Sequence, residues 1–279
     1  MGHFWNDQYR NNLFIVNELK LKQKTAFISG STQGIGFAIA QQLMAEGAHV
    51  IINGRNPEKT KAAMEQLRAI FPSGNVTGIA ADFSSSDEVA ALIAGLPQID
   101  ILINNVGIFE LKPFTQIDES DWRRMFEVNV LSGARLAKAL LHGMLDRKWG
   151  RIVFISSESG INVPADMIHY GVTKTAMLSL ANGLSKLTRG TEVTVNSILG
   201  GPTYSDGVAG TVEAIAEAQG MTVEQMKAAI LASTNAHSLL QRFIAPEEIA
   251  ALAAYLCSPL AAATNGSSLR ADGGALQML

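Results

Sequence analysis

From residue 24 onward, short runs rich in β-branched residues alternate with longer stretches whose apolar residues recur at helical spacing. This alternation is typical of a parallel β-sheet with helices on both of its faces. Several of the short runs are apolar throughout, as expected of strands that are covered on both sides. We therefore expect an α/β fold built on a doubly wound, seven-stranded parallel sheet. The expected strands are Thr25–Ser29, Val50–Asn53, Val76–Ala80, Ile101–Asn104, Ile152–Ser156, Thr194–Ile198 and Ser268–Arg270.

Residues typical of helix ends support this division of the chain. Asn56 before Pro57 predicts a helix that starts with an N-cap and a proline in its first turn. Ser85 and Glu88 have the spacing of a capping box, and Gly47 follows an expected helix that starts near Gly34.

The chain shows no linker, internal repeat or low-complexity tract between residues 23 and 279, which predicts a single domain. Residues 1–22 are expected to form an N-terminal arm. Apolar residues of the arm favour docking over disorder: Trp5, Phe14 and Ile15. Residues 203–240 predict a helical insertion that serves as a substrate lid, with plain helix packing as the alternative.

Composition excludes several classes of protein. The chain has 22 Lys and Arg against 25 Asp and Glu, a net charge of −3, which argues against a general nucleic-acid binder. Its longest apolar run, Ile249–Cys257, is too short to span a membrane. A single cysteine and no evident signal peptide favour the cytoplasm. No metal site is expected, because five histidines are scattered without ligand spacing: His3, His49, His142, His169 and His237.

A glycine-rich loop follows the first expected strand directly and opens the first helix. Such a loop lets backbone amides and a helix N-terminus approach a pyrophosphate, although a simple turn is the alternative. The loop has the spacing GxxxGxG and predicts a dinucleotide site formed by Gly30, Ser31, Thr32, Gln33, Gly34, Ile35 and Gly36.

The end of the second expected strand bears on which dinucleotide binds. A carboxylate there would hold the ribose 2′-hydroxyl of NAD, but the sequence reads Asn53-Gly54-Arg55. A guanidinium suits a phosphate, so NADP(H) is favoured and NAD(H) stays possible. The alternative is that Arg55 is a solvated residue before a helix. Asp82, with Phe83, follows the third strand, where it is expected to accept from the adenine amine or to be a loop residue.

Tyr170 and Lys174 are four residues apart and are expected on one face of a helix. An ammonium beside a phenol would lower the tyrosine pKa, although the same spacing is common in ordinary helices. Ser157 ends the fifth expected strand, so it should face the same cleft as the glycine loop. Glu158 and Asp166 are expected to be solvated or capping, and His169 to lie at the surface or at the substrate rim.

Together these motifs resemble the short-chain dehydrogenase/reductase family, in its compact form with an unbroken Rossmann sheet. The resemblance covers about residues 24–275, with Ser29 in place of the usual threonine before the glycine loop. The other matching motifs are Asn104-Asn105-Val106-Gly107, Asn129 within Glu127-Val128-Asn129-Val130, Ser157, Tyr170-Gly171-Val172-Thr173-Lys174, Gly200-Gly201-Pro202-Thr203 and Asp272-Gly273-Gly274.

The resemblance implies roles for four catalytic residues. Tyr170 would be the general acid/base and Lys174 would lower its pKa and bind the nicotinamide ribose. Ser157 would orient the substrate oxygen, and Asn129 would hold a water in a proton relay. Asn105, Val106, Gly107 and Gly201 would lie along the cofactor, and Thr203 would contact its carboxamide. The implied reaction interconverts a carbonyl and a secondary alcohol by hydride transfer.

Three function classes remain open at this point: an NADP(H)- or NAD(H)-linked oxidoreductase, a non-catalytic dinucleotide-binding redox sensor, and a serine hydrolase that uses Ser157 and His169. The hydrolase lacks a nucleophile elbow. The resemblance implies a homodimer or homotetramer. A mostly apolar substrate is expected from the residues that would wall the pocket: Ile108, Phe109, Ile161, Val163, Met167, Pro202 and Tyr204.

Overall fold

The computed structural model of the chain describes residues 19–277. Within this range the chain builds one seven-stranded sheet, in the order β3-β2-β1-β4-β5-β6-β7, and every neighbouring pair of strands is parallel. The expected doubly wound sheet is confirmed. The strands are β1 (Thr25–Ile28), β2 (His49–Gly54), β3 (Val76–Ala80), β4 (Ile101–Asn104), β5 (Trp149–Ser157), β6 (Glu192–Gly200) and β7 (Ser268–Ala271).

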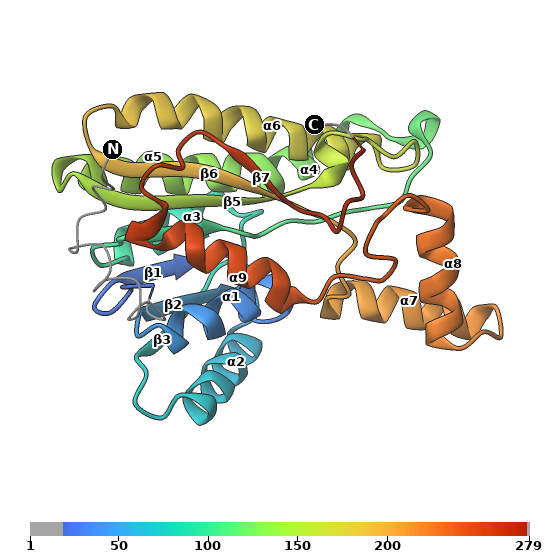
Figure 1. The fold of residues 1–279 in the computed structure, drawn as a ribbon, viewed down its shortest axis with the longest axis horizontal. Coiled ribbons are helices and arrows are strands. Elements are labelled where there is room, and N and C mark those ends of the chain that lie inside the picture. The colour runs from blue at the N-terminus through green and yellow to red at the C-terminus, as the bar shows by residue number, and fades with distance from the viewer. Residues whose placement is uncertain (1–18, 278–279) are drawn as a thin grey trace, which may run out of the picture.

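Helices cover both faces of the sheet (Figure 1). They are α1 (Gly34–Ala45), α2 (Pro57–Ile70), α3 (Ser86–Gly95), α4 (Glu119–Phe126), α5 (Ser132–Asp146), α6 (Ile168–Ser185), α7 (Asp206–Ala218), α8 (Val223–Thr234) and α9 (Pro246–Cys257). Short helical turns complete the list: η1 (Phe114–Gln116), η2 (Glu127–Leu131), η3 (Glu158–Gly160), η4 (Lys186–Thr188) and η5 (Pro259–Ala261).

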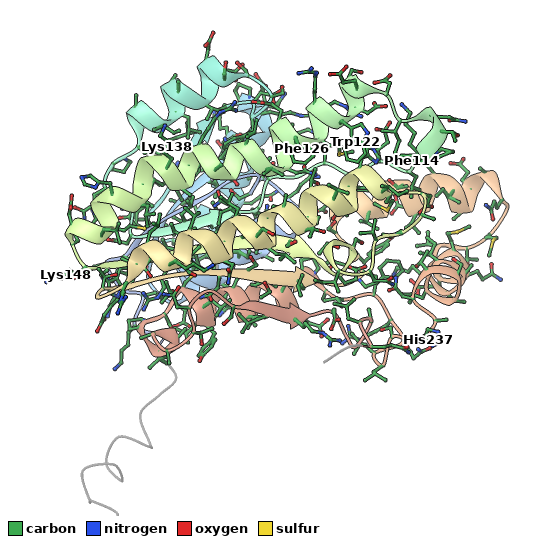
Figure 2. The ribbon with its side chains drawn as sticks, turned by 90° about the horizontal axis from the view of Figure 1, so that it is seen from above. Phe114, Trp122, Phe126, Lys138, Lys148 and His237 are labelled. Atoms are coloured by element: carbon green, nitrogen blue, oxygen red, sulfur yellow. The ribbon has the colours of Figure 1, made fainter. Side chains whose placement is uncertain are left out.

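An apolar core covers each face of the sheet, which explains why several of its strands are apolar throughout. One core joins α1, α2 and α9 to one face of the strands, and the other joins α3, α5 and α6 to the opposite face. Figure 2 looks down on α5 and α6, with Lys148 at one end of the molecule and Phe114 and Trp122 toward the other. Because both faces are buried, the strands need no alternation of apolar and polar residues.

Helix caps agree with the sequence in most details. The Asn56 side chain accepts from the amide of Lys59, and Ser85 accepts from the amide of Glu88. The second half of the expected capping box is wrong, because the Glu88 carboxylate accepts from the amide of Asp82, at 2.8 Å, instead of from Ser85. That bond ties the loop after β3 to the start of α3.

The strand order reverses at β1, because β2 and β3 lie on one side of it and β4 to β7 on the other. In such sheets ligands bind at the carboxyl ends of the strands, beside the point of reversal. The loop after β1 and Ser157 at the end of β5 both lie at this edge. Helices α7 and α8 lie beyond the same edge rather than against the sheet (Figure 1).

Two further segments were expected, an N-terminal arm and a helical insertion, and the role of the insertion as a substrate lid stays a prediction. Residues 1–18, with Trp5, Phe14 and Ile15, lie outside the described residues, so docking of the arm stays a prediction. At the arm's end, Leu21 is fully buried and the amide of Leu19 donates to Glu46 at 2.8 Å. In the insertion, α7 and α8 pack on each other through Val212, Ala216 and Met226. Between residues 19 and 277 no helix is both long and apolar enough to cross a membrane.

Candidate active site

The glycine-rich loop makes a tight turn between β1 and α1. Gly30 and Gly34 both have φ of +60°, a conformation that favours glycine. A Cβ on Gly36 would lie 2.5 Å from the Gly30 carbonyl oxygen and from the Asn105 side-chain nitrogen. The first two glycines therefore allow the turn, and the third allows the start of α1 to approach the strand ends.

Ser29 and Asn105 hold this loop against the loop after β4. The Ser29 hydroxyl accepts from the amides of Asn105, at 3.0 Å, and Val106, at 3.1 Å. The Asn105 side chain donates to the carbonyls of Ser29 and Gly30, at 3.1 and 2.7 Å. A serine thus provides the hydroxyl that the usual threonine would provide at this position.

Ser31 and Asn53 hold the glycine-rich loop in place through hydrogen bonds. Ser31 is fully buried, donates to the Ile28 carbonyl at 2.7 Å and accepts from the amide of Asn53 at 2.9 Å. The Asn53 side chain accepts from the amide of Gly30 at 3.1 Å and donates to the carbonyls of Ile79 and Ala81. Both side chains have partners within the protein, so their expected contact with a cofactor stays a prediction.

The surface beyond β2 is formed by Thr32, Gly54 and Arg55. A Cβ on Gly54 would lie 2.5 Å from the Thr32 methyl group, so Thr32 packs directly on the end of β2. Arg55 is exposed beside it, and none of the hydrogen bonds or ion pairs found within residues 19–277 engages its side chain. Its guanidinium is therefore available to an anion at this strand end.

Asp82 and Phe83 follow β3 on the same side. Hydrogen bonds from Ser84 and the charge of Arg55 hold the pKa of Asp82 below its usual value. Asp82 is therefore a loop acceptor that carries its charge at neutral pH. Phe83 instead packs its side chain into the core, so its expected contact with a cofactor stays a prediction.

An acidic residue that the sequence analysis missed lies at the glycine loop. The amide of Gly34, in the first turn of α1, donates to the carboxylate of Asp206 at 2.7 Å. Asp206 belongs to the first turn of α7. No spacing in the sequence connects these two residues, since they are separated by 172 positions.

Asn129 lies in η2, a π-helical turn between α4 and α5. Such turns are frequent at functional sites because they redirect one side chain from a continuous helix. The Asn129 amide accepts from the amide of Ile108 at 2.8 Å and donates to the Ile108 carbonyl at 3.0 Å. It also donates to the Thr173 hydroxyl at 2.9 Å, which links it to α6.

The structure brings the other three expected catalytic residues to the same place. Ser157 ends β5, and Tyr170 and Lys174 lie in the first two turns of α6. The Lys174 Nζ lies 5.6 Å from the Tyr170 ring centroid and donates to the Ile155 carbonyl at 2.9 Å. A Cβ on Gly107 would lie 3.5 Å from both the Asn129 Oδ1 and the Lys174 Nζ. Because Tyr170 also interacts with Lys174 and with Ser157, one small site holds all four side chains.

Glu158 is a further member of this site. It begins η3 directly after Ser157, and its carboxylate accepts from the Ser157 hydroxyl at 2.6 Å. Burial raises the pKa of the Glu158 carboxyl, against the effect of the bond from Ser157. Glu158, which was expected to be solvated or capping, is half-buried, and the tight turn of η3 brings its carboxylate back to Ser157.

The expected lowering of the Tyr170 pKa is also wrong for this structure. Burial and the carboxylate of Glu158 together raise the pKa of Tyr170, and hydrogen bonding with Ser157 opposes them. Burial lowers the pKa of Lys174 to about 8, while Glu158 raises it. At neutral pH the site therefore holds a neutral phenol beside an ammonium.

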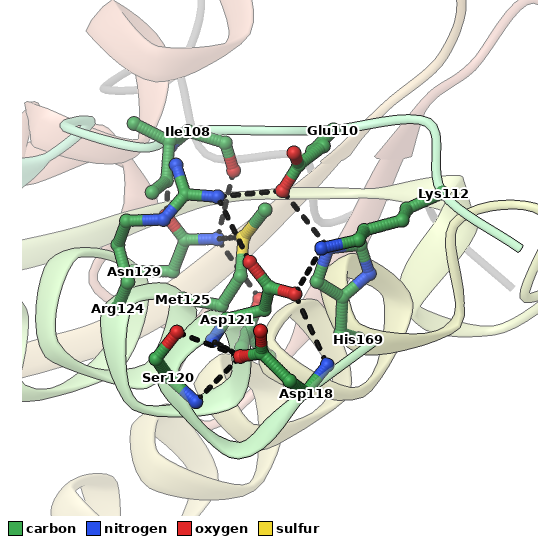
Figure 3. A network of polar contacts seen from close by, with 11 residues as sticks. Ile108, Glu110, Lys112, Asp118, Ser120, Asp121, Arg124, Met125, Asn129 and His169 are labelled. Atoms are coloured by element: carbon green, nitrogen blue, oxygen red, sulfur yellow. Dashed lines mark hydrogen bonds and ion pairs between the residues drawn. The ribbon is translucent and has the colours of Figure 1, made fainter. Parts of the chain in front are cut away.

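A network of charged side chains fixes the loop after β4 above this site (Figure 3). Arg124 of α4 donates to Glu110 at 2.5 Å and lies 3.6 Å from Asp121, which in turn pairs with Lys112. Asp118 caps α4 through the amide of Ser120. The loop after β4 is therefore held at two points, by Asn129 at Ile108 and by Arg124 at Glu110.

His169 is not at the surface or the substrate rim. Its side chain is fully buried, and its ring lies edge-on to Trp122. Its Nε2 lies 3.6 Å from Glu110 (Figure 3). The helix explains the difference, because neighbouring residues of α6 point to different sides. Of the two neighbours His169 and Tyr170, only Tyr170 faces the site. Ser157 donates to Glu158, so the geometry gives no support to a serine hydrolase.

Gly201 and Thr203 follow β6 at the same edge. A Cβ on Gly201 would lie 2.7 Å from the Asp272 backbone, and the Thr203 hydroxyl donates to the Gly201 carbonyl at 2.9 Å. The side chains expected to line the pocket include Phe109, which lies edge-on to Tyr170 with ring centroids 6.4 Å apart. Phe109, Ile161 and Val163 are all exposed.

Comparisons with known proteins point to one family of oxidoreductases. The short chain dehydrogenase family matches residues 24–216. An uncharacterised oxidoreductase of Bacillus subtilis, YvaG, is 42% identical over 257 residues, which are 92% of this chain and 97% of the relative. The 3-oxoacyl-[acyl-carrier-protein] reductase FabG of Aquifex aeolicus is 32% identical, over 92% of this chain and 99% of its own.

Among solved structures, L-sorbose reductase from Gluconobacter frateurii, in complex with NADPH and L-sorbose, superposes with a TM-score of 0.88. It is 27% identical and covers 94% of this chain and 100% of its own. Fold, site and relatives together define a nicotinamide-dependent oxidoreductase. The chain belongs to the short-chain dehydrogenase/reductase family.

The residues present fit a nicotinamide dinucleotide. The glycine loop leaves no room for a Cβ at Gly36 and presents the start of α1, which is how such loops meet a pyrophosphate. The residues that would hold the group are those of the loop, Arg55, Lys174 and Thr203. Their individual contacts with it stay predictions.

Proposed function

We propose that the protein is an NADP(H)-dependent reductase that interconverts a carbonyl and a secondary alcohol. The observation that carries this proposal is the convergence of Ser157, Tyr170 and Lys174 at the carboxyl edge of the sheet, beside the glycine loop. The sorbose reductase, an NADPH-bound relative in fold, supports the same chemistry. A homodimer or homotetramer and a cytoplasmic location stay predictions.

When bound, the dinucleotide supplies the hydride that the carbonyl carbon accepts. The protein's own part is to orient the carbonyl and to deliver a proton to its oxygen. Tyr170 is the proton donor, and a phenol that is neutral at physiological pH is in the form that reduction requires. The Lys174 ammonium stabilises the phenolate that remains after the proton leaves.

Asn129 and Ser157 fix the positions of these groups. Asn129 keeps the Ile108 backbone and Thr173 together, so the loop over the site and the helix that carries Tyr170 cannot move independently. Ser157 contributes a hydroxyl to the substrate oxygen. The exposed side chains of Phe109, Ile161 and Val163 give the pocket a mostly apolar wall.

Preference for NADP(H) is proposed from Arg55, which is exposed after β2, a strand that ends in Asn53-Gly54 without the carboxylate that would hold a ribose 2′-hydroxyl. Titration of the protein with NADPH and NADH, followed by fluorescence or calorimetry, tests it. NADPH is expected to bind at least about tenfold more tightly, and Arg55→Ala should remove most of that preference. Glu65→Gln, on the exposed face of α2, is the control.

Equal affinity for NADH and NADPH would contradict the proposed preference and leave an NAD(H)-linked dehydrogenase. NADPH binding without turnover of any member of a broad panel of ketones and aldehydes would favour the redox sensor. Loss of turnover in Tyr170→Phe, with NADPH binding retained, is expected if Tyr170 is the proton donor.

A further inference from the structure

Among residues 19–277, Glu158 is the one ionisable group in contact with Ser157 that the proposed reaction does not use. It is half-buried, and its Oε2 lies 2.6 Å from the Ser157 Oγ. Its charge also acts on Tyr170 and on Lys174. A carboxylate in this position faces the place where a substrate oxygen must bind.

The hydrogen-bonding capacity of Ser157 shows what this contact means. A serine hydroxyl has one hydrogen to donate and two lone pairs that accept. Ser157 gives its hydrogen to Glu158 and accepts from the amide of Ser159 at 3.1 Å. In this arrangement it has no hydrogen left for a substrate carbonyl.

A substrate therefore has to change the partner of Glu158. If Ser157 turns its hydrogen to a carbonyl oxygen, the half-buried carboxylate of Glu158 loses that donor. A carboxylate can only accept, so a donor group on the substrate would restore the lost hydrogen bond. Two hydrogen bonds of ordinary length, about 5 to 6 Å end to end, separate Glu158 from an oxygen held by Ser157. A hydroxyl on the carbon next to the carbonyl lies within that reach.

We propose that Glu158 is a specificity-determining residue that accepts a hydrogen bond from a hydroxyl adjacent to the reacting carbonyl, so that the site selects α-hydroxyketones over plain ketones. The inference rests on the proposed carbonyl reduction at Ser157 and Tyr170. The substrate hydroxyl takes the place of Ser157 as donor to Glu158, and Ser157 then donates to the carbonyl oxygen. The remainder of the substrate lies against the apolar wall.

A kinetic test uses butan-2-one and 1-hydroxybutan-2-one, which differ by one hydroxyl. The ratio of their kcat/KM values is expected to favour the hydroxyketone in the wild type and to fall at least about tenfold in Glu158→Leu. Leucine has a similar size, cannot accept a hydrogen bond and frees the Ser157 hydrogen. Because Glu158 also acts on Tyr170 and Lys174, the readout is the ratio of the two kcat/KM values and not the absolute rate on butan-2-one. Glu65→Gln should leave the ratio unchanged.

A binding test needs no turnover. The affinities of butane-1,2-diol and butan-2-ol for the NADPH-loaded protein are measured by calorimetry. The diol is expected to bind the wild type at least about tenfold more tightly, and Glu158→Leu should abolish this difference. Retained NADPH affinity shows that the variant is folded.

The outcomes separate the two proposals. Reduction of both ketones with the same ratio in wild type and Glu158→Leu overturns the role of Glu158 and leaves the reductase function standing. A parallel loss on both ketones shows a structural role and also overturns it. A diol preference that depends on Glu158, without reduction of either ketone, supports the recognition of hydroxyl groups and contradicts the proposed function.

Discussion

The carboxylate of Asp206, at the start of α7, accepts a hydrogen bond of 2.7 Å from the amide of Gly34, at the start of α1. This amide belongs to the helix N-terminus that faces an incoming pyrophosphate in proteins with such loops. Two anions would then compete for one end of the helix dipole. We therefore expect cofactor binding to be coupled to the position of α7.

Replacement of this acid should strengthen cofactor binding. In Asp206→Ala the amide of Gly34 has no competing carboxylate, and the dissociation constant for NADPH is expected to fall about threefold to tenfold. The matched control is Glu224→Ala, which removes an exposed acid from the first turn of α8. Calorimetric titration at low salt measures both. Unchanged or weaker binding in Asp206→Ala would contradict the competition.

The buried charge of Lys174 is expected to lower the free energy of unfolding of the protein. Burial disfavours the charge and lowers the pKa of Lys174 from its ordinary value of 10.5 to about 8 in the folded protein. Below pH 8 the buried ammonium bears this whole penalty, and between pH 8 and 10.5 the unfolded chain binds more protons, so wild-type stability rises with pH. Lys174→Met is expected to gain about 1–3 kcal/mol at pH 7 and progressively less toward pH 10.

Urea denaturation at the two pH values measures this change. The control is Lys138→Met, on the exposed side of α5 (Figure 2), which should show no such dependence on pH. A Lys174→Met variant that is less stable than wild type at pH 7 would show that the bond to Ile155 outweighs the burial of the charge.

Replacement of Asn129 is expected to lower both the stability of the protein and its turnover. Asn129→Ala leaves the amide and the carbonyl of Ile108 without their partner, and a buried unpaired polar group is costly. We expect a loss of about 1–3 kcal/mol in the free energy of unfolding and a lower kcat, with NADPH affinity largely retained. Thr173→Val removes one of the same bonds and should lose about 1 kcal/mol or less. Equal losses in both variants would contradict the central role given to Asn129.

The sheet could be predicted from sequence because its cause is local. Each strand is a short apolar run between glycine or polar turns, and the periods of strands and helices differ, so Val76–Ala80 and Ile101–Asn104 have the expected bounds. Ser157, Tyr170 and Lys174 were predictable because a strand end and one face of one helix define their positions.

The polar partners of the site could not be predicted in this way. Asp206 meets Gly34 across 172 residues, and the side chain of Glu158 returns to Ser157 only because η3 turns at that point. The burial of His169 depends on Trp122 and Glu110, which come from other segments. Such contacts arise from tertiary packing, which periodicity along the chain does not encode.

The reactivity of the Cys257 thiol reports how readily α9 separates from the sheet. Cys257 is the one cysteine of the chain and ends α9, fully buried in the core on the α1 side of the sheet. Burial raises the pKa of its thiol to about 12, although Arg151 lowers it. The reactive thiolate is therefore scarce in the folded protein at pH 8, and the thiol is also screened from reagents.

We expect 5,5′-dithiobis(2-nitrobenzoic acid) to label no thiol in the native protein at pH 8 over minutes, and to label one per chain in 6 M guanidinium, a concentration of the order that unfolds most domains. In intermediate denaturant, labelling should follow the opening of α9, because the thiol reacts only after it leaves the core. Cys257→Ala, which abolishes labelling, confirms the origin of the signal. Rapid labelling of the native protein would show that α9 separates from the sheet far more readily than its burial implies.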